Sequence, residues 1–185
     1  EYTTDYGSGT HRFTEAKTKK GKNLSIGPRV NLDQERCVLC RRCVRFMKEI
    51  VGEEVLGVVG RGTHNAIALY PGTSLDSNYS MNVVDICPVG AMTSKDFRFK
   101  MRVWFLKSTP TIDVNCGTGT NINIWTREQQ VYRITPRQND AVNSCWMPDD
   151  HRLNYKFINA PTRITTPLVK TDAGAGQRPS TWDAT

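Results

Sequence analysis

The residues of this chain best suited to bind a metal group are four of its six cysteines. Three of them stand two residues apart in Cys37-Val-Leu-Cys40-Arg-Arg-Cys43, and Cys87 lies far along the chain in Asp-Ile-Cys-Pro-Val-Gly-Ala. A C-x2-C-x2-C triplet with a remote Cys-Pro is the pattern by which ferredoxin-type loops hold a cubane iron–sulfur cluster. The proline supplies no N–H and stiffens the turn after the fourth ligand. The pattern predicts one 4Fe–4S cluster on Cys37, Cys40, Cys43 and Cys87, and therefore electron transfer.

The positions that a second cluster would need hold other residues. In the two-cluster pattern C-x2-C-x2-C-x3-C-P, each run lends its last cysteine to the other cluster. The missing ligands would fall at Met47, Ser77, Ser80 and Val83. The segment is therefore interpreted as a two-cluster ferredoxin reduced to one cluster.

Zinc and disulfides are the alternatives to iron and sulfide. Four cysteines that include a C-x2-C pair also suit structural zinc, which would make the chain a zinc-stabilised interaction module. The third closely spaced cysteine and the Cys-Pro-Val-Gly-Ala tail favour the cluster. Six cysteines in 185 residues are not a disulfide-dense composition, and a cluster implies a reducing compartment.

Two cysteines, Cys116 and Cys145, are left over. A second cubane could be laid on Asp113, Cys116, Thr120 and Cys145, but two of these four are not cysteine and threonine is a poor iron ligand. We expect two buried free thiols instead. The isolated histidines receive no ligand role, and no residue is assigned a catalytic role.

The chain carries a formal charge of +7. Its lysines and arginines are scattered, which does not favour nucleic-acid binding. The densest positive group surrounds the cysteines, as expected for compensation of an anionic cluster: Arg36, Arg41, Arg42, Arg45 and Lys48. No apolar run approaches the roughly 18 residues that span a bilayer, so we expect no direct transmembrane span.

The sequence divides into four parts and predicts an α+β fold, in which a ferredoxin-type iron–sulfur domain precedes a small β-rich module. Residues 1–34 are predicted to be an extended N-terminal arm, and residues 35–100 the ferredoxin-type 4Fe–4S domain. Residues 101–157 form the β-rich module, and residues 158–185 are a linker into another domain. This organisation places all four candidate ligands in one domain.

Within these parts, apolar spacing and turn residues predict individual elements. A helix should follow the triplet and end at Gly52, and residues 55–59 and 66–70 should form a hairpin. Further along, we expect strands at 103–106 and 111–114, a hairpin of 121–125 with 131–135, and a helix capped by Asp149 and Asp150 that runs to Phe157.

Taken together, these residues resemble the large iron–sulfur subunit, of the 75 kDa type, of respiratory complex I, the NADH:quinone oxidoreductase. Residues 32–46 and 85–91 are similar to one of its cubane sites, and residues 1–7 to the segment just after its His-ligated cluster motif. Residues 162–170 and Trp182 are similar to the start of its molybdopterin-oxidoreductase-like domain. The resemblance implies that the chain is one segment of a longer polypeptide.

The resemblance also implies a role. The chain would be an electron-transfer subunit of this translocase, passing single electrons through one 4Fe–4S cluster between flavin-side and quinone-side clusters. Further 2Fe–2S and 4Fe–4S clusters would belong only to absent upstream segments. Residues 101–157 resemble the 4Fe–4S domain of molybdopterin oxidoreductases, with the cluster expected to be lost.

Partners and place follow from the same resemblance. They would be other peripheral-arm subunits, namely the flavin-binding subunit and the quinone-side iron–sulfur subunits. The location would be the cytoplasmic face of the bacterial inner membrane or the mitochondrial matrix side. A diaphorase-type subunit of an NAD-linked hydrogenase or formate dehydrogenase is the alternative.

Overall fold

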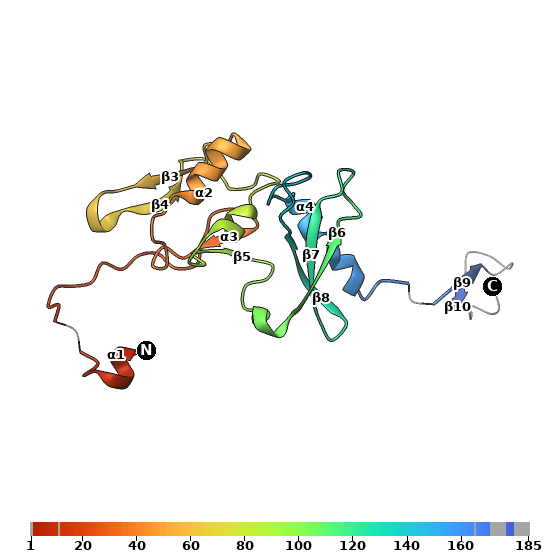
Figure 1. Cartoon of the computed structure of the whole chain (residues 1–185), viewed down its shortest axis with the longest axis horizontal. Coiled ribbons are helices and arrows are strands. Elements are labelled where there is room, and N and C mark those ends of the chain that lie inside the picture. Colours follow the sequence, from red (N-terminus) through yellow and green to blue (C-terminus); the bar gives the residue numbers. More distant parts are fainter. Residues whose placement is uncertain (1, 11, 165, 171–176, 180–185) are drawn as a thin grey trace. The chain divides into compact units, whose positions relative to one another are not determined.

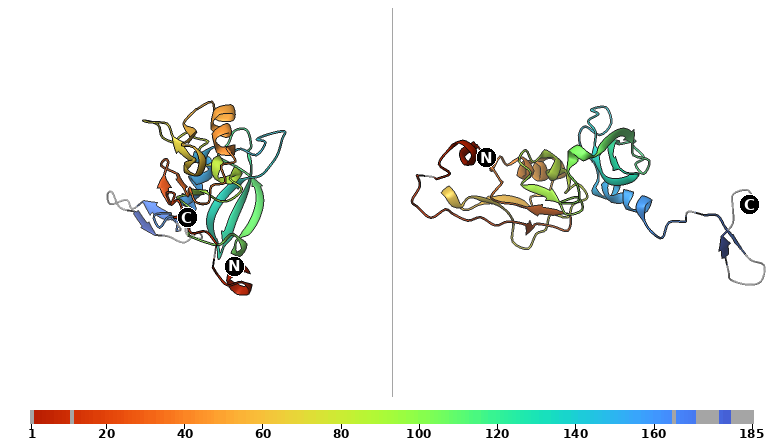
Figure 2. Two further views of the ribbon diagram at one scale, coloured as in Figure 1. Left: turned by 90° about the vertical axis from the view of Figure 1, so that its left-hand side faces the viewer. Right: turned by 90° about the horizontal axis from the view of Figure 1, so that it is seen from below.

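The computed structural model describes residues 2–10, 12–164, 166–170 and 177–179 (Figure 1). It consists of short helices and small, mostly antiparallel sheets, as two further views show (Figure 2). This confirms the α+β fold class.

Contacts divide the chain into two compact units. The first unit comprises residues 1–75 and 83–93, and the second comprises residues 76–82 and 94–185. Residues 76–82, which shortly precede Cys87, therefore fold with the second unit.

A three-stranded sheet underlies the first unit, in the order β1 (Leu24–Ser25), β2 (Val30–Leu32) and β5 (Met92–Ser94). β1 and β2 are antiparallel, and both ends of β2 are fully buried. A Cβ on Gly27, in the turn between them, would lie 2.0 Å from the carbonyl oxygen of Leu75. Only glycine allows that approach. Residues 24–32, which the sequence placed in an extended arm, thus form two strands.

A helix follows the cysteine triplet, as predicted. α2 (Arg42–Arg45) continues directly as the π-helical η1 (Phe46–Val51). Gly52 ends it with a φ of 83° while its N–H bonds to the Met47 carbonyl oxygen. Phe46 and Met47 are buried in the core. Met47 stands where a second cluster would need a cysteine, and its side chain packs in the core instead.

The remaining elements of the first unit include the predicted hairpin. β3 (Leu56–Val59) pairs antiparallel with β4 (Ala66–Leu69) across the η2 turn (Gly62–His64). α1 (Tyr2–Tyr6) is exposed. α3 (Asn82–Ile86) begins at the last residue of the 76–82 segment and ends immediately before Cys87.

The second unit is built on an antiparallel sheet in the order β6 (Lys107–Ile112), β7 (Asn121–Arg127) and β8 (Gln130–Pro136). β7 and β8 form the predicted hairpin. α4 (Asp149–Leu153) and η4 (Asn154–Asn159) pack on β8. The buried apolar residues of this unit are Met81, Leu106, Ile122, Met147 and Tyr155. Beyond them, β9 (Leu168–Lys170) pairs with β10 (Gln177–Pro179) where the sequence predicted a linker, and Trp182 lies outside the described residues.

Two local predictions in this unit were wrong. Residues 103–105 form a 3-10 turn, η3 (Val103–Phe105), instead of a strand, and β6 starts at Lys107 instead of 111. Asp149 is the first helical residue of α4, after Pro148, and does not cap the helix. The strand at residues 103–106 was predicted from their apolar side chains, but of these four only Leu106 is buried.

A buried polar cluster holds residues 76–82 inside the second unit. The Ser80 hydroxyl donates to Asp149 Oδ2 at 2.6 Å, and the Met81 N–H donates to Asp149 Oδ1 at 3.0 Å. The Asn82 side chain exchanges hydrogen bonds with the Met147 N–H and carbonyl. Ser80, Asn82 and Asp149 are fully buried, so each depends on these partners.

Candidate metal centre

The four predicted ligands meet around one cavity of the first unit. Cys43 is buried, Cys37 and Cys87 are half-buried, and Cys40 is exposed. The cavity is also lined by apolar and basic residues: Leu32, Val38, Arg41, Arg42, Ile67, Val89, Ala91 and Met92. The fold thus brings the remote Cys87 to the triplet.

The backbone of the triplet is curled by two residues in the left-handed region. Leu39 has a φ of 56° and Arg41 a φ of 61°, which is uncommon for residues other than glycine. Left-handed residues alternating with others turn successive N–H groups toward the concave side of a loop. The Leu39 N–H donates to Cys37 Sγ at 3.4 Å, as this geometry requires.

The position of Cys87 is fixed by the sheet. The loop after it returns through Gly90, with a φ of 62°, into β5. The Met92 N–H at the start of β5 donates to Cys87 Sγ at 3.5 Å. The Asp33 N–H binds the Ala91 carbonyl at 2.8 Å, which ties this loop to the chain just before the triplet.

Burial and neighbouring charge oppose a free thiolate at the bottom of the cavity. Burial first, and then the nearby Cys37, Cys40 and Cys87, raise the pKa of Cys43 to about 11. A group that binds all four sulfurs and carries positive charge removes that penalty. The donor set and its electrostatics therefore fit a thiolate-ligated metal group.

Of the basic residues near the triplet, only Arg41 and Arg42 line the cavity. Three others lie beside acidic side chains: Arg36 near Asp33, Arg45 with Glu49, and Lys48 with Glu54. Of the five basic residues expected to compensate the negative charge of a cluster, only Arg41 and Arg42 therefore lie at the cavity.

The placement of the thiols differs from that of a single-ion site. Among the described residues, no three His, Cys, Asp or Glu side chains are placed to share one metal ion. Zinc needs its four ligands within about 2.3 Å of one point. A cubane instead takes one sulfur at each of four irons, and the four cysteines that line the cavity could supply one each.

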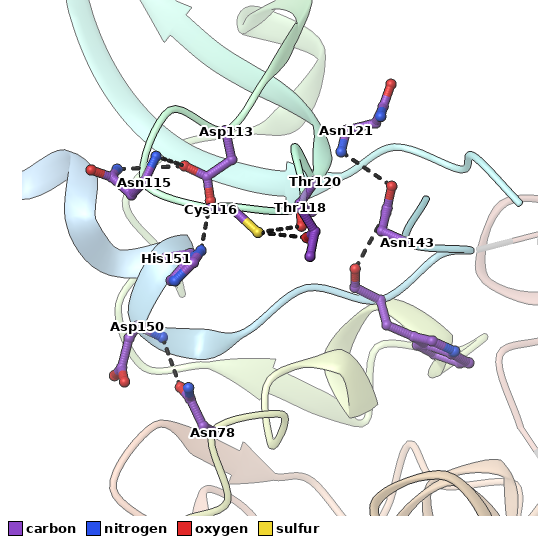
Figure 3. A network of polar contacts seen from close by, with 11 residues as sticks. Asn78, Asp113, Asn115, Cys116, Thr118, Thr120, Asn121, Asn143, Asp150 and His151 are labelled. Carbon is purple, nitrogen blue, oxygen red and sulfur yellow. Dashed lines mark hydrogen bonds and ion pairs between the residues drawn. The ribbon is translucent and has the colours of Figure 1, made fainter. Parts of the chain in front are cut away.

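The second candidate site holds a polar network (Figure 3). Asp113 is buried, accepts from the Asn115 N–H at 3.0 Å and pairs with His151 Nδ1 at 2.9 Å. Cys116 Sγ lies 2.9 Å from the Thr118 hydroxyl and 3.1 Å from the Thr120 hydroxyl. Hydrogen bonds from these hydroxyls lower the pKa of Cys116 to about 6.

The expectation that Cys116 and Cys145 are buried was wrong. Cys116 is half-buried and Cys145 is exposed, although neither forms a disulfide. Thr118 and His151, which the sequence did not single out, complete the network. No spacing pattern indicated His151, because its contact with Asp113 spans 38 residues, whereas Thr118 lies only two residues from Cys116.

Comparison with known proteins agrees with this arrangement. A family model described as the ferredoxin-like domain of NADH-quinone oxidoreductase subunit 3 matches residues 27–93. A second, described as the NADH-ubiquinone oxidoreductase NDSU1/NuoG-like 4Fe–4S domain, matches residues 106–156. The first match covers most of the first unit and also residues 76–82 of the second, whereas the second match lies wholly within the second unit.

Whole-chain comparison gives the same result. The chain is 41% identical over 184 residues to the mitochondrial NADH-ubiquinone oxidoreductase 78 kDa subunit of Candida albicans, covering 99% of this chain and 25% of that protein. It is 43% identical over 165 residues to an NADH-quinone oxidoreductase subunit of Rickettsia felis, covering 89% of this chain and 24% of that protein. The chain belongs to the family of the large iron–sulfur subunit of NADH–quinone oxidoreductase. It spans about a quarter of the length of these relatives.

Family membership confirms the class of cofactor expected from the cysteines. The ferredoxin-like and 4Fe–4S domain matches indicate a 4Fe–4S cluster. In this family member, however, the matched 4Fe–4S domain holds Asp113 and Thr120 at two of the positions where we considered cysteine ligands. Cluster number and ligand identity remain predictions.

Proposed function

We propose that this chain is an electron-transfer part of an NADH–quinone oxidoreductase and holds one 4Fe–4S cluster on Cys37, Cys40, Cys43 and Cys87. The observation that carries the proposal is the convergence of these four cysteines on one cavity within the ferredoxin-like match. A bound cubane supplies reversible one-electron chemistry.

The residues around the cavity have distinct tasks. The cysteines anchor the group, and the Leu39 and Met92 N–H groups donate to the sulfurs of Cys37 and Cys87. Such hydrogen bonds stabilise negative charge on the thiolates and so favour the reduced state. Arg41 and Arg42 add positive charge at the rim.

The second unit is proposed to carry no cluster. Its candidate ligands Asp113, Cys116 and Thr120 already satisfy one another or their neighbours through hydrogen bonds. A cluster there would have to break these contacts and use a hydroxyl as a ligand. This unit then serves as a structural part of the subunit.

Partners and place are proposed from the relatives. Those relatives are subunits of bacterial or mitochondrial NADH–quinone or NADH–ubiquinone oxidoreductases. We propose the flavin-binding and quinone-side iron–sulfur subunits as partners, on the cytoplasmic or matrix side of the membrane. Among the described residues, no helix has both the length and the apolar character needed to cross a bilayer.

Metal and sulfide analysis of anaerobically purified protein tests the proposal. About four iron and four sulfide per chain are expected, with an EPR signal in the reduced state. Zinc without sulfide would refute electron transfer by this chain. About eight iron would show that the second unit also holds a cluster.

A further inference from the structure

An exposed group of two aromatic rings, tilted against each other, and two guanidinium groups lies at the start of the second unit's sheet. The Arg102 guanidinium stands 5.7 Å from the Trp104 ring, and Trp104 stands 6.0 Å from Phe105. The Arg127 guanidinium lies 5.3 Å from the Phe105 ring. We name these four residues (Arg102, Trp104, Phe105 and Arg127) the aromatic ladder. Trp104 is 73% exposed and Phe105 is 57% exposed.

The aromatic ladder stands on ordered backbone. The Phe105 N–H bonds to the Arg102 carbonyl at 3.1 Å and the Leu106 N–H to the Val103 carbonyl at 3.0 Å, which closes η3. Leu106 is buried and leads directly into β6. Large side chains held outward by a fixed turn lose little conformational entropy when a partner covers them.

Arg127 is held in place as well. Its guanidinium donates to Met101 Sδ at 3.6 Å and to Glu128 Oε1 at 3.0 Å while it stacks on Phe105. Arg102 differs, because among the described residues it has no acidic partner. The ladder therefore presents at least one uncompensated positive charge beside its rings.

Trp125 of the same sheet is a tryptophan whose ring and indole N–H both have partners within this unit. It is half-buried, Arg133 covers its ring at 4.4 Å, and its indole N–H donates to the Thr135 hydroxyl at 2.9 Å. Within the described part of the chain, the Trp104 indole N–H has no acceptor. Packing of this unit thus explains Trp125 and does not explain Trp104.

We propose that the aromatic ladder is a docking site for another protein subunit, one whose surface offers an apolar pocket bordered by carboxylates. Exposed tryptophan and arginine are the residues most enriched among those that carry binding energy in protein interfaces. Arg102, which has no acidic partner within the described ranges, and the chain's charge of +7 favour an acidic rim on the partner. This inference rests on the proposed role of the chain as a subunit.

A protein partner fits better than the two other anionic surfaces. Nucleic acid would require several lysines and arginines in a stripe that follows phosphates, and the ladder has only two arginines. An anionic membrane would require a long amphipathic helix or a polybasic cluster, and η3 has three residues. A compact pair of rings flanked by single charges matches a pocket on a folded protein.

The test uses the full-length subunit expressed in cells that lack their own copy. Trp104→Ala and Phe105→Ala should each lower the fraction of the chain that co-migrates with the assembled oxidoreductase on native gels by about tenfold. Phe157→Ala is the matched control, because Phe157 is also 57% exposed in the second unit but lies outside the ladder. It should leave assembly unchanged.

Charge and partner identity need separate measurements. Arg102→Glu reverses the charge at an exposed position, so it should weaken assembly more than Arg102→Lys and make it less sensitive to added salt. A photo-crosslinking phenylalanine analogue at position 104 should join a peptide of another subunit rich in Asp and Glu. The same analogue at position 157 should not join that peptide.

Several outcomes would overturn the docking site. These are unchanged assembly in all ladder variants, equal loss in Phe157→Ala, and crosslinks only to the chain itself, to nucleic acid or to lipid vesicles containing phosphatidylglycerol. Circular dichroism melting separates loss of folding from loss of docking, since Arg102→Glu should not change the melting temperature. Iron and sulfide are measured separately on the purified 185-residue chain: a full cluster there, with unaltered assembly of the variants, refutes only the docking site, whereas absence of the cluster refutes the proposed function.

Discussion

The cysteine sulfurs of the two candidate sites differ in the groups that hydrogen-bond to them. Around the cavity of the first unit, the described sulfur contacts of Cys37 and Cys87 come from backbone N–H groups, and no side chain takes the place of a metal. In the second unit, two hydroxyls contact Cys116, and Asp113 is paired with His151. If the proposed function holds, iron completes the ligands of the first site, whereas protein groups already contact the candidate ligands of the second.

The largest effect should come from removing the remote ligand. Cys87→Ala takes away one of four thiolates and opens the cavity, so the EPR signal of the reduced cluster should disappear or change form. Iron analysis and EPR on anaerobic protein measure this. Cys116→Ala is the control and should keep the signal. If Cys116→Ala loses the signal as well, the contrast between the two sites is false.

The next effect concerns the internal bonds of the second unit. Asp149→Ala leaves the buried Ser80 hydroxyl and Met81 N–H without their acceptor, which should lower the free energy of unfolding by about 3 kcal/mol. Denaturant unfolding followed by tryptophan fluorescence measures it. Asp150→Ala, at an exposed neighbouring position, should change stability by no more than about 0.5 kcal/mol. Equal losses in the two variants would contradict the role given to the buried carboxylate.

A smaller effect should appear in the pH dependence of Cys116 alkylation. The thiolate is the reactive form, so the rate should fall as pH drops through about 6 and level off above it, well below the ordinary thiol value of 9.0. Thr118→Val removes a hydroxyl that donates to the thiolate, which favours the neutral form and should raise the pKa by about one unit. Rates of iodoacetamide labelling between pH 5 and about pH 9 test this. A rate in the wild type that still rises steeply at the alkaline end would contradict it.

The smallest effect should come from the two arginines at the cavity. Reduction adds negative charge to the cluster, and nearby positive charge favours the reduced state. Replacing Arg41 and Arg42 by Gln should therefore lower the midpoint potential by roughly a few tens of millivolts, because both side chains are exposed and screened. Redox titration followed by EPR measures the shift. Arg45→Gln is the control, since Arg45 is paired with Glu49 and does not line the cavity.

The sequence predicted the parts of the structure that depend on local spacing. The cysteine triplet, the helix end at Gly52 and the β7–β8 hairpin are each set by residues a few positions apart. The convergence of Cys87 on the triplet spans 44 residues and was predicted only because a triplet with a remote Cys-Pro is the ferredoxin-type cluster pattern.

What the sequence missed depends on tertiary contacts. Residues 24–32 form only two short strands, β1 and β2, and one neighbour of β2 in the sheet is β5, which lies far along the chain. Val103 to Leu106 are apolar enough for a strand, yet three of the four side chains are exposed. Asp149 was interpreted as a helix cap because its true partners, Ser80 and Met81, lie in a distant segment.

The assignment of residues 76–82 to the second unit has a consequence for inheritance and engineering. The chain crosses the boundary between the two units several times, so a single cut cannot separate them. Division after residue 93 would leave Ser80 and Asn82 on one fragment and their partners Asp149 and Met147 on the other. The two units therefore cannot be exchanged between relatives as independent cassettes. Because residues 83–93 return to the first unit, recombination within this family should preserve the whole span from β1 to α4 as a block, and a gene fusion that breaks the block should yield insoluble protein even when every cysteine is retained.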